Sequence, residues 1–503
     1  MRETALNYEI IIMAIAIFAL NAHASASPAI TPTPVPAVVK KKPSTAPKFY
    51  GSLRIRPEDW QWFQPIAPKT SKNNYLFTGS LLKVGMNGQF TGGEYDFELA
   101  ETSLFNLPKT SSLPTPIGPF GPGANYYANS AGSTSSAFLK QGYVRLWNPG
   151  DTANSIKLGR FDFNEGVETK PSDPSLNVIQ QTRIQQRLIG TFSYSDIQRS
   201  FDGFQYVHNT KDVNVTAFGA MPTQGVFTLN GDNNDLGNVK VGYIALTSPQ
   251  REKSVPQLGR LFFIDYEDDR PDTVKTDNRP LAVRTADTDD IRIQTIGGDY
   301  ARVFPTSAGK FDILGWGADQ FGHWGDQTQE AYAYDAEVGY QPPHLPLSPW
   351  LRAGYYVASG DNNPNDGVHK TFFLVLPTPR IYARLPFFTQ TNLHDAFVEL
   401  TLRPDAKTTI RTDLHDLSLD QSADLWYQGG GAFTTTGNFG YSGTPSGGQT
   451  QLATLADASV DYKINKRSSV SVYYGYAFPG KVIKTEYTGQ AGSMEYVEFT
   501  QTF

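Results

Sequence analysis

At 503 residues, the chain is long enough for several soluble domains of about 100 to 200 residues, although β-barrels routinely run longer as one unit. It contains no cysteine, which excludes a disulfide framework and a thiolate metal site. The formal net charge of −6 argues against a nucleic-acid-binding protein, which would need a basic face. Aromatic residues make up 13% of the chain and glycine is abundant, a mixture that favours strands and tight turns over helices.

The N-terminal segment has the pattern of an export signal. The apolar run Ile10 to Leu20 is too short to span a bilayer as a helix, which takes about twenty residues, and small residues follow it at Ala24 and Ala26. We therefore predict a signal peptide over residues 1–26. The proline-rich residues 27–48 then form an extended periplasmic linker, and residues 49–503 form the folded domain.

Beyond this linker, apolar and polar residues alternate with a period of two, which predicts strands. We expect about eighteen strands averaging about ten residues, the length that a tilted strand needs to cross a membrane. The first has a break at Pro57, and the expected ranges are 49–63, 77–90, 95–105, 138–147, 156–163, 201–208, 213–221, 239–247, 258–266, 291–304, 310–321, 331–341, 350–359, 395–403, 408–419, 456–464, 468–478 and 494–503.

The connections between these strands are of two kinds. Residues 405–408 and 465–468 are tight turns, whereas residues 106–136, 267–290, 360–394 and 420–455 are long and rich in turn-forming residues. Short turns on one rim and long loops on the other are typical of outer-membrane barrels. The predicted fold is all-β: a transmembrane, antiparallel, up-and-down β-barrel of about 18 strands, with long extracellular loops and short periplasmic turns.

The alternation also assigns the two faces of each strand. Near the C-terminus, Val472 and Tyr474 share an outer face, whereas Ser471 and Asp461 belong to the polar inner face. The chain ends on a strand at Phe503, which can pair with the first strand and leave no open edge in the lipid. This terminal aromatic residue also resembles the signal read by the barrel assembly machinery, so the expected partners are this machinery and the outer-membrane bilayer.

A barrel of about this size leaves an aqueous lumen, and the charges that line it decide which ions pass. The alternation of faces along each strand (odd or even position, here called parity) places a set of charged residues on the inner face: Arg145, Arg352, Arg411, Asp413, His415, Glu399, Asp335 and Glu337. Two interpretations remain open. These residues form a structural ion-pair network across the lumen, or unpaired arginines create an electropositive constriction.

Three stretches resemble the alginate-export family of outer-membrane barrels. They are KLGRFDF at residues 157–163, QQRLIGTFSYSDIQRSFDGFQY at 185–206, and residues 355–404 with the unit Ala-Ser-Gly-Asp at 358–361; the similarity covers most of residues 145–431. The resemblance implies an eighteen-stranded barrel, narrowed by arginines, through which an anionic polysaccharide passes. By motif position, Arg160, Arg187 and Arg199 carry over, with Asp202 as an acidic counterpart. The chain departs from the family pattern at Phe161 and Gln185-Gln186.

We find no local pattern for catalysis, no metal site and no cofactor-binding motif, since both the H-E-x-x-H and G-x-S-x-G motifs are absent. The loop from Asp361 to Gly367 begins like a calcium loop but lacks its glycine and closing glutamate. The first hypothesis is therefore a passive channel for anionic polysaccharide or oligosaccharide. The alternatives are a general or small-anion nutrient porin on the same barrel, and a barrel enzyme or adhesion surface that works through the long loops.

Overall fold

The computed structural model describes residues 46–66, 71–114, 117–130, 132–248, 255–379 and 383–503. The predicted signal peptide and residues 27–45 of the predicted linker lie outside this part of the chain. The first strand begins at Lys48, one residue before the predicted start of the folded domain.

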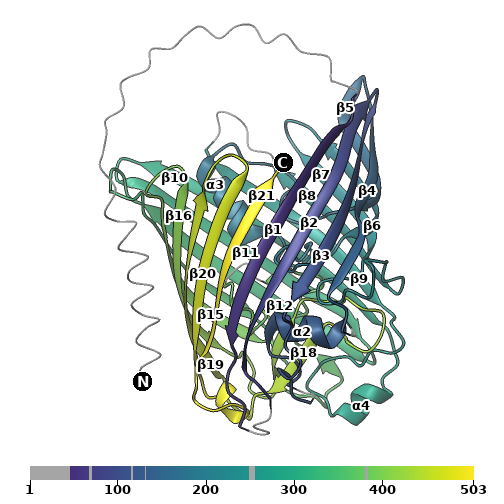
Figure 1. Cartoon of the computed structure of the whole chain (residues 1–503), viewed down its shortest axis with the longest axis vertical. Helices are drawn as coiled ribbons and strands as arrows, with labels where there is room; N and C mark the ends of the chain where they lie inside the picture. Colours follow the sequence, from purple (N-terminus) through teal and green to yellow (C-terminus); the bar gives the residue numbers. More distant parts are fainter. Residues whose placement is uncertain (1–45, 67–70, 115–116, 131, 249–254, 380–382) are drawn as a thin grey trace. The chain divides into compact units, whose positions relative to one another are not determined.

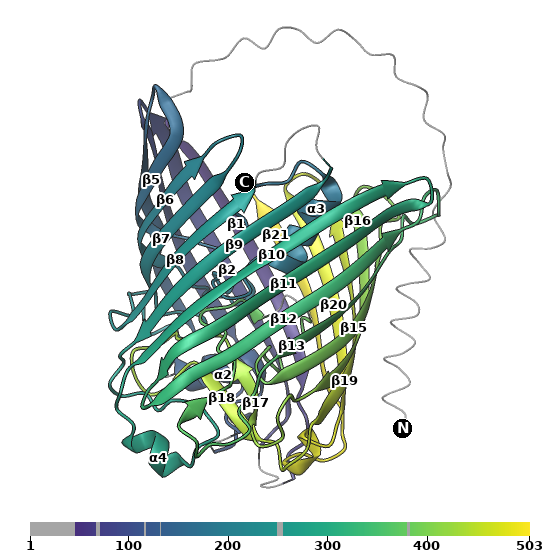
Figure 2. The same ribbon diagram turned by 180° about the vertical axis from the view of Figure 1, so that it is seen from behind.

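Eighteen long antiparallel strands form a closed barrel, as the sequence predicts (Figures 1 and 2). Each strand pairs with its neighbour along the chain, and β1 pairs with β21 to close the sheet. The strands are β1 (Lys48–Gln61), β2 (Asn74–Phe90), β3 (Gly93–Phe105), β4 (Ser135–Asn148), β5 (Asp151–Phe161), β6 (Phe201–Asn209), β7 (Asn214–Pro222), β8 (Val239–Ser248), β9 (Gln257–Asp268), β10 (Ile291–Thr306), β11 (Gly309–Trp324), β12 (Gln327–Gln341), β13 (Trp350–Ala358), β15 (Leu393–Leu402), β16 (Thr408–Ser418), β19 (Gln451–Lys463), β20 (Ser468–Pro479) and β21 (Gly492–Thr502).

The predicted break at Pro57 is wrong, because β1 runs through it. Pro57 stays in register with Thr78 of β2. On the other side of β1, Ile55 and Glu58 pair with residues of β21, but Arg56 and Pro57 between them do not. Proline has no N–H to donate, so it is tolerated where one ladder is interrupted while the strand remains extended.

The assignment of the two faces is confirmed. Val472 and Val497 are among the large apolar side chains exposed on the outside, whereas Tyr473 and Tyr496 on the same strands are buried. The outer face therefore meets lipid and the inner face meets the lumen.

Connections at the two ends of the barrel differ in length. One end carries short turns and the C-terminus; at the other end lie the helices α2 (Gly121–Asn129) and α4 (Leu281–Ala286) and the hairpin β17 (Leu425–Gly429) and β18 (Tyr441–Pro445) (Figure 1). By the rule for outer-membrane barrels, the short-turn end faces the periplasm. No helix in the described part of the chain is long and apolar enough to cross a membrane.

The longest loop inside the barrel was not among the long connections predicted from the sequence. Residues 162–200, here called the inserted loop, connect β5 to β6 and carry helix α3 (Pro174–Ile179) and the π-helical turn η1 (Gln180–Ile184). The side chain of Asp173 caps α3 by accepting hydrogen bonds from the N–H groups of Ser175 and Leu176. Helix α3 lies near the short-turn end, so the inserted loop runs through the lumen from the long-loop end toward the short-turn end (Figures 1 and 2).

Many aromatic side chains pack inside the lumen. Trp60 of β1 and Trp426 of β17 are almost fully buried in one cluster, together with Phe387 and Tyr487 from two other loops. Because loops and wall share this apolar core, the long-loop end of the lumen is packed over part of its width. The open part of the lumen is therefore set by where the loops leave the wall uncovered.

Candidate functional site: a basic pocket in the lumen

Ion pairs fix the inserted loop to the wall formed by β11, β12 and β13. Arg183 and Arg187 of the loop meet Glu337 and Asp335 of β12 at 2.8 Å and 2.6 Å. Arg352 of β13 also pairs with Glu337, at 2.8 Å. All five side chains are buried, so each charge depends on its neighbours.

The opposite wall holds the same loop through β1. The guanidinium group of Arg54 pairs with Asp196 at 3.0 Å and donates hydrogen bonds to the backbone carbonyls of Ser193 and Ser195. Arg56 donates to the carbonyl of Tyr194 at 2.6 Å. The inserted loop is thus attached to opposite sides of the barrel and crosses the lumen.

A third attachment joins the start of the loop to β9 and β10. Arg260 of β9 forms an ion pair with Glu165 of the loop and another with Asp299 of β10, the latter at 2.6 Å. Lys140 of β4 pairs with Asp162 of the loop and donates to the carbonyl of Arg199. These contacts pack the loop against the β4 and β9 walls and leave the wall from β16 to β1 accessible.

Arg187 and Arg199, which the resemblance nominates, are both buried in the inserted loop. Arg199 donates to the carbonyl of Gly430 at 2.6 Å, and no carboxylate lies within ion-pair distance of it among the described residues. Burial lowers the pKa of Arg199 to about 10. The Arg-Leu-x-Gly unit has a packing role, because Gly190 donates to the carbonyl of Leu376 where a second loop passes alongside.

Arg160 and Asp202 lie on the outer side of the wall, which corrects the expectation that they line the lumen. They pair with each other at 2.5 Å, and in the β5–β6 register they share the parity of the exposed Leu158 and Phe204. The motif that nominated them carries no information on strand parity, and parity decides which face a side chain occupies. Arg145 does share the inner face, where it pairs with Glu94 at 3.1 Å.

The remaining nominated residues form one inner-face cluster on β15 and β16. Arg411 pairs with Glu399 at 3.2 Å and with Asp413 at 2.8 Å. On the same face, His415 contacts Asp395 at 2.9 Å. Together with the pairs of Arg187 and Arg352, this cluster is the structural network that the first interpretation describes. No group of three or more His, Asp or Glu side chains in the described residues could hold a metal ion.

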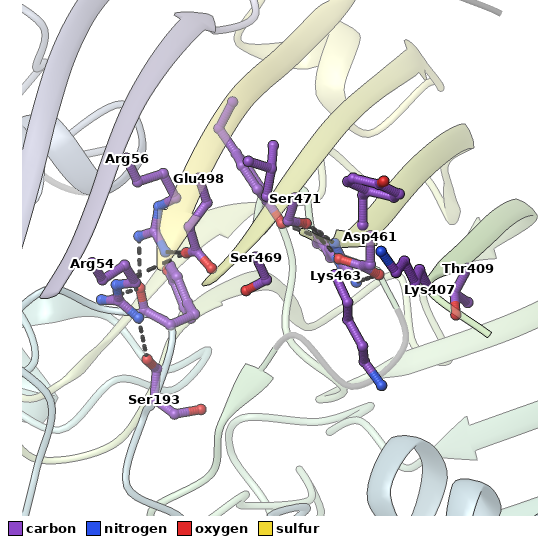
Figure 3. A pocket seen from close by; sticks show the side chains of 15 residues that line it. Arg54, Arg56, Ser193, Lys407, Thr409, Asp461, Lys463, Ser469, Ser471 and Glu498 are labelled. Atoms are coloured by element: carbon purple, nitrogen blue, oxygen red, sulfur yellow. Dashed lines mark hydrogen bonds and ion pairs between the residues drawn. The ribbon is translucent and has the colours of Figure 1, made fainter. Parts of the chain in front are cut away.

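A pocket of about 430 Å³ remains open between the inserted loop and the wall from β16 to β1 (Figure 3). Hydroxyl and aromatic groups lie between the charged residues of its lining. The charged residues are five cations and two carboxylates: Arg54, Arg56, Arg384, Lys407, Lys463, Asp461 and Glu498. In Figure 3, Arg54 and Arg56 lie with Glu498 on one side, and Asp461, Lys407 and Lys463 lie on the other.

The five cations of this pocket are held to different degrees. Arg56 is enclosed by Glu58 at 2.7 Å and Glu498 at 3.0 Å. Arg384 is held more loosely, at 3.5 Å from the half-exposed Asp461 and 2.9 Å from the hydroxyl group of Tyr496. Partly exposed ion pairs of this kind contribute about 1 kcal/mol or less, so Asp461 holds Arg384 only weakly.

Sequence reasoning placed Asp461 and Ser471 on the inner face but did not single out the pocket. Arg54 and Arg56 could have been found, because two arginines two residues apart on a strand share one face. Arg384 gave no such signal: it belongs to a loop, and only the three-dimensional path of that loop brings it to the wall of β19, β20 and β21.

The closed barrel with a lumen crossed by an internal loop defines an outer-membrane channel. Solved porin structures share this fold. Pseudomonas aeruginosa OccK9 (OpdG) gives a TM-score of 0.53 at 10% identity, covering 91% of this chain and 98% of that one. Acinetobacter baumannii OccAB4 gives 0.53 at 7% identity with the same coverage, and Pseudomonas aeruginosa OprD gives 0.50 at 9% identity, covering 90% of this chain and 94% of that one.

The family follows from the sequence match. The model of the alginate export family matches residues 181–496, which is more than half of the chain, so the chain belongs to this family. A comparison with curated proteins finds no match. The family and the fold place the protein in the outer membrane as a channel for solutes, as the sequence predicts.

Proposed function

We propose that the protein is an anion-preferring channel that passes negatively charged oligosaccharide or polysaccharide chains through its lumen. The observation that supports this proposal is the basic pocket, where five cations face two carboxylates in the part of the lumen that the inserted loop leaves open. A uronate chain presents regularly spaced carboxylates, which guanidinium groups bind with two-pronged hydrogen bonds.

The chemistry of the pocket suits passage better than tight capture. Arg384, Lys407 and Lys463 are held by few contacts, and hydroxyl groups of Thr409, Ser469 and Ser471 lie between the charges. Conduction requires several weak sites, so that an anion leaves one as it reaches the next. Tyr194 and Tyr496 add ring surfaces on which sugar rings can pack.

A small-anion porin is the second candidate. It is favoured by the buried ion pairs of Arg183 and Arg187, which fix the inserted loop across the lumen and limit the width available to a polymer. On this alternative, the same pocket attracts small carboxylates, and no chain threads the barrel.

Planar-bilayer recordings separate the two candidates. The purified protein is tested with galacturonate monomer, with oligogalacturonate and with a neutral maltooligosaccharide of equal length. A polymer channel is blocked in discrete events by the oligouronate, weakly by the monomer and not by the neutral chain. Equal effects of monomer and oligomer support the small-anion porin, and an unselective current without block by any sugar would refute both.

Recognition of the Phe503 strand by the assembly machinery remains part of this proposal.

A further inference from the structure

The strand register sorts the charges of the basic pocket into rows across the inner wall. Lys463 of β19 is opposite Ser469 of β20, Ser469 is opposite Thr500 of β21, and Thr500 is opposite Arg54 of β1. The carbonyl of Lys407 accepts a hydrogen bond from the N–H of Lys463, which extends the row by one position. This row, here called the rim row, carries three positive side chains and no carboxylate of its own. Arg54 is paired with Asp196 of the inserted loop, which leaves the two lysines as its uncompensated charges.

The next row toward the long-loop end has a different charge. It consists of Thr409, Asp461, Ser471, Glu498 and Arg56. This row therefore contains two carboxylates and one arginine. Between the two rows, which are two residues apart on each strand, the net charge of the wall changes from positive to negative. The guanidinium group of Arg384 reaches this second row from the loop side, where it contacts Asp461 and Ser471.

The rim row lies beside the short turns. Lys407 belongs to the connection between β15 and β16, and Lys463 ends β19 immediately before the turn to β20. Both lysine side chains are exposed, and neither has a carboxylate within ion-pair distance among the described residues. Their charges are therefore available to a ligand that approaches from the periplasmic end.

We propose that Lys407 and Lys463, in the same row as the paired Arg54, form a capture site for polyanions at the periplasmic mouth of the lumen, so that the channel takes up its substrate faster from that side. This inference rests on the proposed function. A cluster of like charges at a mouth raises the local concentration of oppositely charged ligand and its association rate, with a strong dependence on ionic strength. The acidic residues of the second row keep the anion from remaining bound at the rim row, since they repel it, and Arg384 offers the next positive charge on the loop side.

The test measures the rate of block from each side of a single channel. The chain has no cysteine, so Ser307→Cys in the exposed turn between β10 and β11 can be labelled from one chamber with an impermeant maleimide to report orientation. Oligogalacturonate is then added to either chamber at low and at high salt. The matched charge variants are Lys407→Gln with Lys463→Gln, and Lys466→Gln in the neighbouring exposed turn, outside the pocket.

The expected result is a block association rate several-fold higher from the periplasmic side at low salt. The double variant lowers the rate from the periplasmic side more than the rate from the extracellular side and so removes this difference, whereas Lys466→Gln retains it. Equal rates from both sides in the unmodified channel, or equal losses from both sides in the double variant, would overturn the capture site while leaving the proposed function intact. Absence of block from both sides, in a channel without anion preference, would overturn the proposed function as well.

Discussion

The guanidinium group of Arg187 lies 2.6 Å from the carboxylate of Asp335, and both side chains are buried between the inserted loop and β12. The same arginine stacks over the ring of Trp316, 4.9 Å from its centroid. Through this pair a loop that begins at the long-loop end is held deep in the lumen. The position of the loop in the lumen thus depends on buried ion pairs.

Removing this pair should free the inserted loop. We expect Arg187→Met to cost about 3–5 kcal/mol locally, because it takes away the buried guanidinium that faces Asp335. Hydrogen exchange of residues 183–190 should then accelerate by about a hundredfold or more, while the barrel strands exchange as before. Arg145→Met is the matched control, since its pair with Glu94 is partly exposed and worth about 1 kcal/mol or less. Unchanged exchange in the Arg187 variant would show that this pair does not hold the loop.

Neutralising Arg384 should lower the anion preference of the channel. Arg384→Gln removes one of five pocket cations and keeps a side chain able to reach Tyr496. We expect the reversal potential under a salt gradient to move toward zero and the residence time of oligouronate to fall several-fold. Lys240→Gln is the control, because Lys240 lies on the outer face, where it pairs with Glu267 at 3.3 Å. If both variants shift selectivity equally, the pocket is not its source.

The loops at the extracellular end should tighten as the pH falls. Burial raises the pKa of Asp424, just before β17, to about 6. A carboxyl group with a folded-state pKa above its unfolded value stabilises the fold below the unfolded pKa, and this contribution is lost as the pH rises through 6. Normalised exchange protection near Asp361, whose N–H donates to Asp424, should therefore be greater at pH 5 than at pH 7.

Asp424→Asn provides the comparison, because an amide does not titrate. Protection in this variant should be lower overall, since one acceptor oxygen is lost, but equal at pH 5 and pH 7. A pH dependence that persists in the variant would assign the effect to other groups, such as Asp361 itself, whose pKa is also raised by burial.

The last residue should matter more for assembly than for the finished channel. Phe503 exchanges two backbone hydrogen bonds with Gly51 at 3.1 Å and 3.0 Å, and its ring covers that glycine. We expect Phe503→Ala to reduce the amount of folded barrel in the outer membrane severalfold. The same variant, refolded in detergent and then inserted into a planar bilayer, should conduct normally. Phe478→Ala, an equally exposed aromatic residue on the outer face of β20, should have little effect on assembly. Similar losses in both variants would point to lipid contact and not to recognition of the terminus.

Strand positions were predictable from the sequence because lipid on one side and a polar lumen on the other impose a period of two on every strand. This is why the sequence alone assigns Val472 and Asp461 to opposite faces, as the structure shows. The inserted loop was not predictable, since its path depends on long-range pairs such as Arg183 with Glu337, 154 positions apart. For the same reason, motif position could not show that Arg160 points outward, or that Arg384 reaches the pocket.

The central claim is that the open part of the lumen favours anions because more cations than carboxylates line it. The reversal potential of single unmodified channels between a tenfold gradient of potassium chloride tests this claim most directly. A reversal potential of the sign that anion flow produces, falling toward zero when Arg384, Lys407 and Lys463 are replaced with Gln together, is the predicted result. A cation-selective current, or anion selectivity that survives this triple replacement unchanged, would contradict it.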